Sequence, residues 1–448
     1  MMTIKEFQEK LLADAMDAGF KEAEVYYERS ESFRCTIFEG EIDSYETSEE
    51  GGLGLRGLYN GKMGYAYTEK IEEASIPFLI DSAKANADVL DEDDGSDIFE
   101  GSENYATHNF FSEELTQVSI PDKIALIKSI EKKTLNYDPR ITTLNYCVIQ
   151  DFSTDRDMSN NKGLSLNEKK NGLVVFVSAV VKDGDEKKTG SVVKMTRDYE
   201  SINADEIAKE VAEEALSNLG EQSIPTRKYP IIMRHDAARS LLSTFTPIFS
   251  AENTQKDQSL LKGKVGTVIG SSAFTLIDDP FHPGSVGGAN FDGEGVATEK
   301  RTIVAEGTLQ TLFHNRKTAK KDCVETTGHA HKSSYKGTLS VAPINLYIAP
   351  GKKSKDELIA SVDEGVFITG LAGLHSGVST ISGDFSVAAT GFHIKDGKVS
   401  SSVKQMTIAG NYFDYMKSIE EVGSDLEFSP GGYGSPSLLV KELSVTVD

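Results

Sequence analysis

Three histidines, at two places in the C-terminal half, are the residues whose types and spacing could hold a metal ion. His329 and His331 are separated by one residue. Residues i and i+2 of a β-strand point to the same face, so the two imidazoles could bind one zinc ion. His235 is followed by Asp236 at the expected start of a helix, where the helix dipole stabilises a first-turn carboxylate. A zinc site made of His235, His329 and His331 would supply three nitrogen ligands, but it requires the loop around His329 to fold across that helix.

The cysteines predict reduced thiols rather than a disulfide framework. Cys35, Cys147 and Cys323 are odd in number, far apart and outside any CxxC pair. Cys323 lies close to His329, which raises a nucleophile as an alternative, but no His/Asn partner pattern accompanies it. We therefore expect structural thiols.

A glycine-rich run over residues 284–295 invites two interpretations. Gly284-Ser285-Val286-Gly287-Gly288 resembles a phosphate-binding loop only superficially, because the Gly-Lys-Ser/Thr ending is missing. We expect this flexible backbone instead to lie against an extended peptide, whose N–H and C=O groups can pair with strand edges.

Composition excludes several classes of function. The chain has 448 residues, with 47 Lys and Arg against 70 Asp and Glu, giving a net charge of −23 that would repel the phosphate backbone of DNA. No apolar run approaches the 18 or so residues of a membrane span, and the first residues lack the apolar core of a secretory signal. The sequence therefore predicts a cytoplasmic protein that binds neither nucleic acid nor membrane directly.

The N-terminal half shows two cycles of helix, antiparallel strands and helix. In the first cycle a helix from Ile4 precedes short strands separated by Glu39-Gly40, Gly51-Gly52 and Asn60-Gly61, which are typical hairpin turns. A second helix, over residues 71–89, is followed by the acidic run Asp91-Glu92-Asp93-Asp94-Gly95, which we expect to be its exit loop. The second cycle consists of a helix over Asp122–Asn136, a strand over Thr142–Gln150, a hairpin over Gly172–Thr196 and a helix over Asp205–Leu219. We expect an N-terminal α+β region over residues 1–222, and the repeated pattern suggests two similar lobes, 1–105 and 106–222.

The C-terminal half, residues 223–448, reads as a β-rich domain. Tyr229–Met233 predicts a short buried strand, Asp236–Phe245 a helix, and Glu306-Gly307 and Asp396-Gly397 mark hairpins. Many short strands without alternating helices favour a barrel-like or sandwich-like arrangement over a doubly wound fold. The fold class expected for the whole chain is α+β.

Several runs in this half, in order along the chain, resemble one known family. These runs are Phe291–Val296 (FDGEGV), Thr326–Gly328, Thr380–Ser386, Ala389–Phe392, Gln405–Asn411 and Val422–Asp425. They resemble the TldD/PmbA family, called modulators of DNA gyrase, and in particular its PmbA (TldE) branch. The resemblance covers most of the C-terminal half and extends more loosely into the N-terminal half.

The resemblance implies a metal site that is degenerate in this chain. The catalytic branch carries a His-Glu-x-x-x-His motif, in which two histidines hold the metal and the carboxylate activates its water. Its counterpart here begins at His235 and replaces the Glu by Asp236 and the second His by Ser240. A further Cys ligand, in a Pro-Gly-x-Cys-Gly run, has Tyr433 in its place. The resemblance implies no metal on this chain, and it suggests substrate-binding roles for Thr327, Gly328, His329 and His331.

The family also implies a function and a partner. Its members are implicated in proteolysis of small or unfolded polypeptides and in maturation of peptide precursors. A PmbA-type chain pairs with a zinc-bearing TldD-type chain around a shared cavity, so we expect this chain to be the metal-free subunit, and a homodimer when alone. The alternative is an independent homodimeric peptidase with the rebuilt site at His235, His329 and His331.

Overall fold

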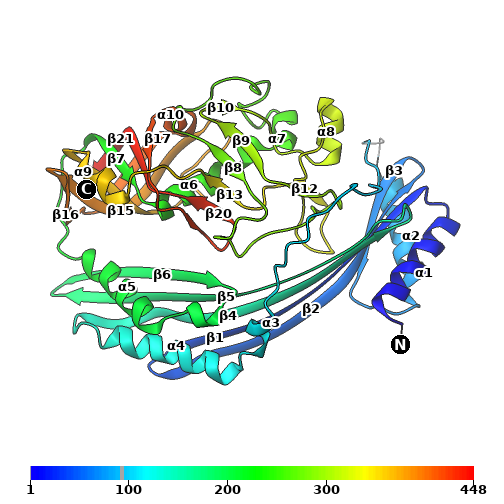
Figure 1. Cartoon of the computed structure of the whole chain (residues 1–448), viewed down its shortest axis with the longest axis horizontal. Coiled ribbons are helices and arrows are strands. Elements are labelled where there is room, and N and C mark those ends of the chain that lie inside the picture. Colours follow the sequence, from blue (N-terminus) through cyan, green and yellow to red (C-terminus); the bar gives the residue numbers. More distant parts are fainter. Residues whose placement is uncertain (1, 91–94, 448) are drawn as a thin grey trace.

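A long, curved N-terminal sheet and a C-terminal β-barrel domain make up the molecule (Figure 1). The computed structural model describes residues 2–90 and 95–447. The exit loop predicted over residues 91–94 therefore lies outside the described residues. The C-terminal domain lies over one face of the N-terminal sheet, and helices α4 and α5 lie on the other face (Figure 1).

The N-terminal sheet is antiparallel, with the strand order β3-β2-β1-β4-β5-β6. Its strands are β1 Glu22–Phe38, β2 Glu41–Tyr59, β3 Lys62–Thr68, β4 Ile141–Asn160, β5 Ser165–Asp183 and β6 Glu186–Thr196. The helices of this half are α1 Ile4–Asp17, α2 Ser75–Asp88, α3 Glu113–Gln117, α4 Ile120–Leu135, α5 Ala204–Ser217 and the short 3₁₀ turn η1 Tyr199–Ser201. Both cycles of helix, three strands and helix are present, and β1 pairs with β4 to join them into one sheet.

The strands run further than the sequence predicts. The predicted turn at Gly51-Gly52 is wrong, because both glycines lie inside β2, paired with Arg29 and Glu28 of β1. Gly52 allows close packing, because a Cβ atom there would overlap the ring of Tyr335, which arrives from the C-terminal domain. Gly52 therefore marks a domain contact.

The C-terminal domain contains a closed five-stranded barrel, as the β-rich pattern predicted. Its strands pair in the order β14-β7-β21-β17-β15, and β15 returns to pair with β14. These strands are β7 Arg227–Met233, β14 Glu364–Ala372, β15 Asp384–Lys395, β17 Met406–Asn411 and β21 Leu438–Val447. Two further strands extend this sheet, β16 Lys398–Ser402 and β18 Ile419–Val422. The α+β fold class is confirmed.

A second sheet and several short helices complete this domain. The sheet has the order β10-β9-β8-β13-β20-β19, and a separate ribbon pairs β11 with β12. Their bounds are β8 Leu276–Asp278, β9 Arg301–Ala305, β10 Thr308–Leu309, β11 Ala330–Lys332, β12 Leu339–Val341, β13 Leu346–Ile348, β19 Glu427–Phe428 and β20 Tyr433–Ser435. The helices are α6 His235–Phe245, η2 Thr246–Phe249, α7 Ala251–Gln255, α8 Arg316–Asp322, α9 Lys355–Ala360 and α10 Tyr412–Lys417.

Helix α6 is held in the core of this domain by one apolar face. Ala238, Leu241, Leu242 and Phe245 recur at helical spacing and are buried in the largest apolar cluster of the chain. Phe245 stacks on Tyr412 with ring centroids 4.2 Å apart. This packing fixes the position of the opposite end of α6, where His235 lies.

Among the described residues, no helix is long and apolar enough to cross a membrane.

Candidate functional site

The first turn of α6 carries an ion-pair network centred on Arg234. The Arg234 guanidinium donates to both oxygens of Asp236, at 2.8 and 2.7 Å, and to both oxygens of Glu214 on α5, at 2.9 and 2.8 Å. Burial alone would raise the pKa of Asp236, but hydrogen bonds and positive charge from Arg234 outweigh it, so the pKa lies below its usual value. The carboxylate of Asp236 is therefore ionised and already occupied in linking α6 to α5.

His235, in contrast, has a ring nitrogen without a hydrogen bond. Its side chain is 19% exposed, and Nδ1 lies 3.7 Å from a carboxylate oxygen of Glu427. Burial lowers the pKa of His235, and the nearby charge of Glu427 offsets this in part. The imidazole is thus neutral at neutral pH and has a nitrogen free to accept a proton or a ligand.

Neither of the remaining motif positions, Ser240 and Tyr433, provides a second metal ligand beside His235. The Ser240 hydroxyl donates to the carbonyl oxygen of Asp236 at 2.7 Å, within the same helix. Tyr433 on β20 is half-buried, and burial raises the pKa of its phenol, which keeps it protonated. Within residues 2–90 and 95–447, no group of three or more His, Cys, Asp and Glu side chains is arranged to hold a metal ion.

The loop over residues 326–331 places its two histidines in different surroundings. His329 is buried, with Nδ1 2.8 Å from the hydroxyl of Thr327 and Nε2 3.1 Å from a carboxylate oxygen of Asp278. Gly328 is also buried, with a positive φ of 70°. His331 is exposed on β11. Both ring nitrogens of His329 are therefore occupied, and the structure does not bring His235, His329 and His331 together.

The FDGEGV run forms a buried connection between the two halves of the chain, which we call the latch, residues 291–296. Asp292 accepts hydrogen bonds from the backbone N–H groups of Glu294, Val296 and Ala330, at 2.8, 3.0 and 3.0 Å. Burial and the neighbouring Glu294 raise the pKa of Asp292 to about 7, although these N–H donors oppose the shift.

The latch contacts the N-terminal sheet through an ion triad. Glu294 lies 3.6 Å from the guanidinium of Arg56, which in turn contacts Glu24 at 3.1 Å, and all three side chains are buried. Glu294 also accepts from the backbone N–H of Arg316 at the start of α8, at 2.9 Å. From the sequence, this run was expected to contribute to the family resemblance and, as part of residues 284–295, to lie against an extended peptide, but its buried ion triad was not expected. Two acidic residues in a glycine-rich run were the signal available in the sequence, because carboxylates that become buried need partners.

A charged cavity of about 370 Å³ lies between the latch and the sheet. His331 lines it, and is the one predicted site residue that does so. Arg156 and Lys170 contact Glu168 at 2.7 and 3.0 Å, and burial lowers the pKa of Lys170 to about 8. The cavity is lined by Tyr26, Glu28, Phe152, Thr154, Arg156, Glu168, Lys170, Gly288, Ala289, Phe291, Asp292, Gly293, Ala330, His331, Lys332, Ala342, Pro343, Ile344 and Gly431. Its polar walls offer both hydrogen-bond donors and hydrogen-bond acceptors.

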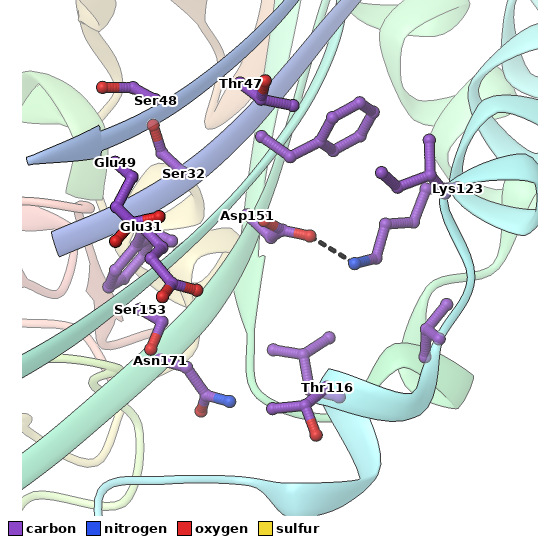
Figure 2. Close-up of a pocket in the computed structure, with 15 residues that line it drawn as sticks. Glu31, Ser32, Thr47, Ser48, Glu49, Thr116, Lys123, Asp151, Ser153 and Asn171 are labelled. Carbon is purple, nitrogen blue, oxygen red and sulfur yellow. Dashed lines mark hydrogen bonds and ion pairs between the residues drawn. The ribbon is translucent and has the colours of Figure 1, made fainter.

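A different cavity, of about 560 Å³, lies on the opposite face of the sheet beside α3 and α4. Its strand residues Glu31, Phe33 and Asp151 alternate in the chain with those facing the charged cavity. Figure 2 shows the ammonium of Lys123 reaching Asp151, so the one cation among the described residues that line this cavity is already paired. None of the predicted site residues lies here.

Three models of a single family together match most of the chain. The C-terminal domain of PmbA/TldA metallopeptidases matches residues 226–447, domain 1 matches residues 23–87, and the central domain matches residues 113–219.

Individual proteins agree with this match. A crystal structure from Thermotoga maritima, described as a proposed modulator of a DNA gyrase, has 32% identity and a TM-score of 0.93, covering 99% of this chain and 100% of that chain. A metalloprotease TldD homolog of Haemophilus influenzae is 24% identical over 94% of this chain and 92% of its own length. TldE from Thermococcus kodakarensis shares the fold, with a TM-score of 0.90 at 23% identity, covering 98% of this chain and 100% of that chain. The chain belongs to the PmbA/TldD metallopeptidase family.

Proposed function

We propose that this chain is the PmbA/TldE-like component of a TldD/TldE-type metallopeptidase system, the subunit that lacks the catalytic metal. The observation that carries the proposal is the first turn of α6. There Asp236 is occupied by Arg234, Ser240 bonds to its own helix, and His235 alone has a free nitrogen. One free nitrogen is too few ligands for a catalytic zinc, which needs three from the protein.

The role proposed for the chain is to bind peptide and to support a TldD-type partner that holds the zinc. The charged cavity supports this role, because Arg156, Lys170 and His331 present polar side chains beside the sheet. The substrate would be a short or unfolded polypeptide, whose backbone is free to make such bonds. Alone, the chain would form a homodimer through the surface that normally meets the partner.

Metal content and complementation test this proposal. We expect elemental analysis of the purified chain to find less than stoichiometric zinc, and we expect the chain alone not to cleave unfolded peptides. Mixed with a TldD-type partner, it should support chelator-sensitive hydrolysis. In that mixture His235→Ala in this chain should leave the rate unchanged, whereas the matched change in the partner's first motif histidine should abolish it. One tightly bound zinc per chain, with cleavage by this chain alone, would instead establish the independent peptidase.

A further inference from the structure

An aromatic cavity of about 480 Å³ lies where the C-terminal domain meets β2, β3 and α2. Four aromatic rings, those of Tyr65, Tyr67, Phe78 and Tyr335, contribute to its walls. The described lining residues are Gly54, Leu55, Tyr65, Ala66, Tyr67, Phe78, Ser82, Asn86, Lys332, Tyr335, Lys336 and Gly337. They include two lysines and no carboxylate, although the chain as a whole has a net charge of −23. The lining therefore favours an apolar ligand that carries a negative charge.

The cavity is built by a segment that crosses between the domains. Tyr335 is only 7% exposed, its ring lies against Gly52, its backbone lies against Gly54, and its hydroxyl donates to Glu69 at 3.2 Å. Lys336 pairs with the same carboxylate at 2.7 Å, so its charge is already balanced. At the rim, in contrast, Phe78 and Tyr67 are 61% and 49% exposed. The floor is thus fixed by packing, while apolar surface at the rim is open.

Lys332 is the cation of this cavity that lacks a carboxylate partner. Its ammonium lies 5.1 Å from the ring centre of Tyr26 and 6.0 Å from that of Tyr65. Among the described residues, no carboxylate lies within ion-pair distance of it. The nearest acidic groups have other partners, as Glu24 and Glu294 contact Arg56 and Glu28 accepts from the hydroxyl of Tyr26.

Three N–H donors of a half-buried ammonium are thus left for a ligand or for water. Burial lowers the pKa of Lys332 to about 8, so the group is still charged at neutral pH. Lys332 also lines the charged cavity that contains His331, so the two cavities meet at this side chain.

We propose that the aromatic cavity binds the C-terminal residue of a peptide, with its apolar side chain among the four rings and its carboxylate hydrogen-bonded to Lys332. The rest of the peptide would run into the adjoining charged cavity. The inference deepens the proposed function, since it takes the peptide as the ligand and names the end by which it is held. A terminal carboxylate on an aromatic or aliphatic residue matches the lining in both shape and charge.

The absence of tryptophan from this chain gives a direct binding assay. The probe is an N-acetylated Ala-Ala-Trp tripeptide, as the free acid or as the C-terminal amide, whose fluorescence is read without any background from the protein's own tryptophan. Because a charge-assisted hydrogen bond contributes about 1.5–3 kcal/mol, we expect the free acid to bind at least about tenfold more tightly than the amide. Equal affinity of the two forms for the native chain would overturn the proposal.

Lys332→Met separates the proposed contact from general effects of charge. This variant should bind the free acid no better than the amide. Lys84→Met is the matched control, because the Lys84 ammonium also lies over a ring, 5.1 Å from the centre of Tyr59, but outside the cavity. The control should keep the full preference for the acid. If Lys332→Met keeps it as well, the carboxylate binds elsewhere.

A third variant tests the aromatic cavity in a chain that is expected to stay folded. Phe78 is exposed, so Phe78→Ser should melt near the native temperature while weakening acid and amide alike by a few fold. Unchanged binding of both forms by a folded Phe78→Ser chain would exclude the aromatic cavity. All these measurements use the chain alone, so they can fail while complementation of a TldD-type partner succeeds, and the two proposals are tested separately.

Discussion

The first turn of α6 and the latch are two acidic sites with opposite design. At α6 the acidic side chains of Asp236 and Glu214 share one arginine near the surface, and His235 keeps a nitrogen without a hydrogen bond. In the latch, Asp292 and Glu294 are buried and accept from backbone N–H groups, and Glu294 also contacts Arg56. The first site has spare bonding capacity, whereas the second has used its capacity to hold two domains together.

This difference distinguishes residues that could act on a substrate from residues that stabilise the fold. Both regions attract attention as charged residues in recognisable runs. Only partners decide their role, because a carboxylate or imidazole whose lone pairs are all engaged has nothing left for a substrate. The comparison predicts that the latch governs stability and that the N-terminus of α6 tolerates change.

The largest effect should come from breaking the ion triad of the latch. Arg56→Met leaves Glu24 and Glu294 buried without their cation, and we expect a loss of about 3–5 kcal/mol in the free energy of unfolding, measured by urea titration. The matched control is Arg29→Met on β1, where the ion pairs with Glu31 and Glu49 are exposed and the cost should stay below about 1 kcal/mol. Similar losses for the two variants would contradict the role assigned to the latch.

An intermediate effect is expected from a pair of histidine variants. His329→Leu removes the ring that contacts Thr327 and Asp278, so it should cost about 1–3 kcal/mol. His235→Leu removes no hydrogen bond and should cost no more than about 0.5 kcal/mol. Thermal melts of both variants at neutral pH measure the contrast, and a more damaging change at His235 would reverse the comparison.

The smallest effect concerns pH. The pKa of His235 is lower in the folded chain than its usual 6.5, so in the window below 6.5 the unfolded state binds the extra proton and the native state loses stability as the pH falls. His235→Gln removes this loss. Its melting temperature relative to the native chain should therefore rise when the pH falls from about 7 to about 5. A relative melting temperature that falls over this range would show that the folded-state pKa is raised.

Much of the fold follows from local pattern. The helix from Ile4, the hairpin turns at Asn60-Gly61 and Asp396-Gly397 and the β-rich barrel domain are confirmed, because periodicity and turn residues are local properties of the chain. Local pattern does not predict that β1 continues through its polar middle, because Glu28 to Ser32 are held in the sheet by pairing with β2 and β4 on either side.

Less of the candidate site than of the fold could be predicted from the sequence. His235 and Asp236 were placed correctly on one helix, but Arg234, which occupies Asp236, is itself held by Glu214 on another element. His329 has the spacing of a metal ligand, but its ring contacts Asp278, which lies 51 residues away in the chain. Such long-range pairs leave no spacing signal, and the metal-free state of α6 stays a prediction that zinc analysis can test.

The contact between Tyr335 and Glu69 can form only late in the synthesis of the chain. The two residues are 266 positions apart, so at roughly 5–20 residues per second the ribosome makes Tyr335 some 10–50 s after Glu69. Until then the aromatic cavity lacks Tyr335, the residue that packs on Gly52. A first lobe that folds before Tyr335 is made therefore leaves Gly52 and Gly54 without the side chain and backbone that cover them in the finished chain.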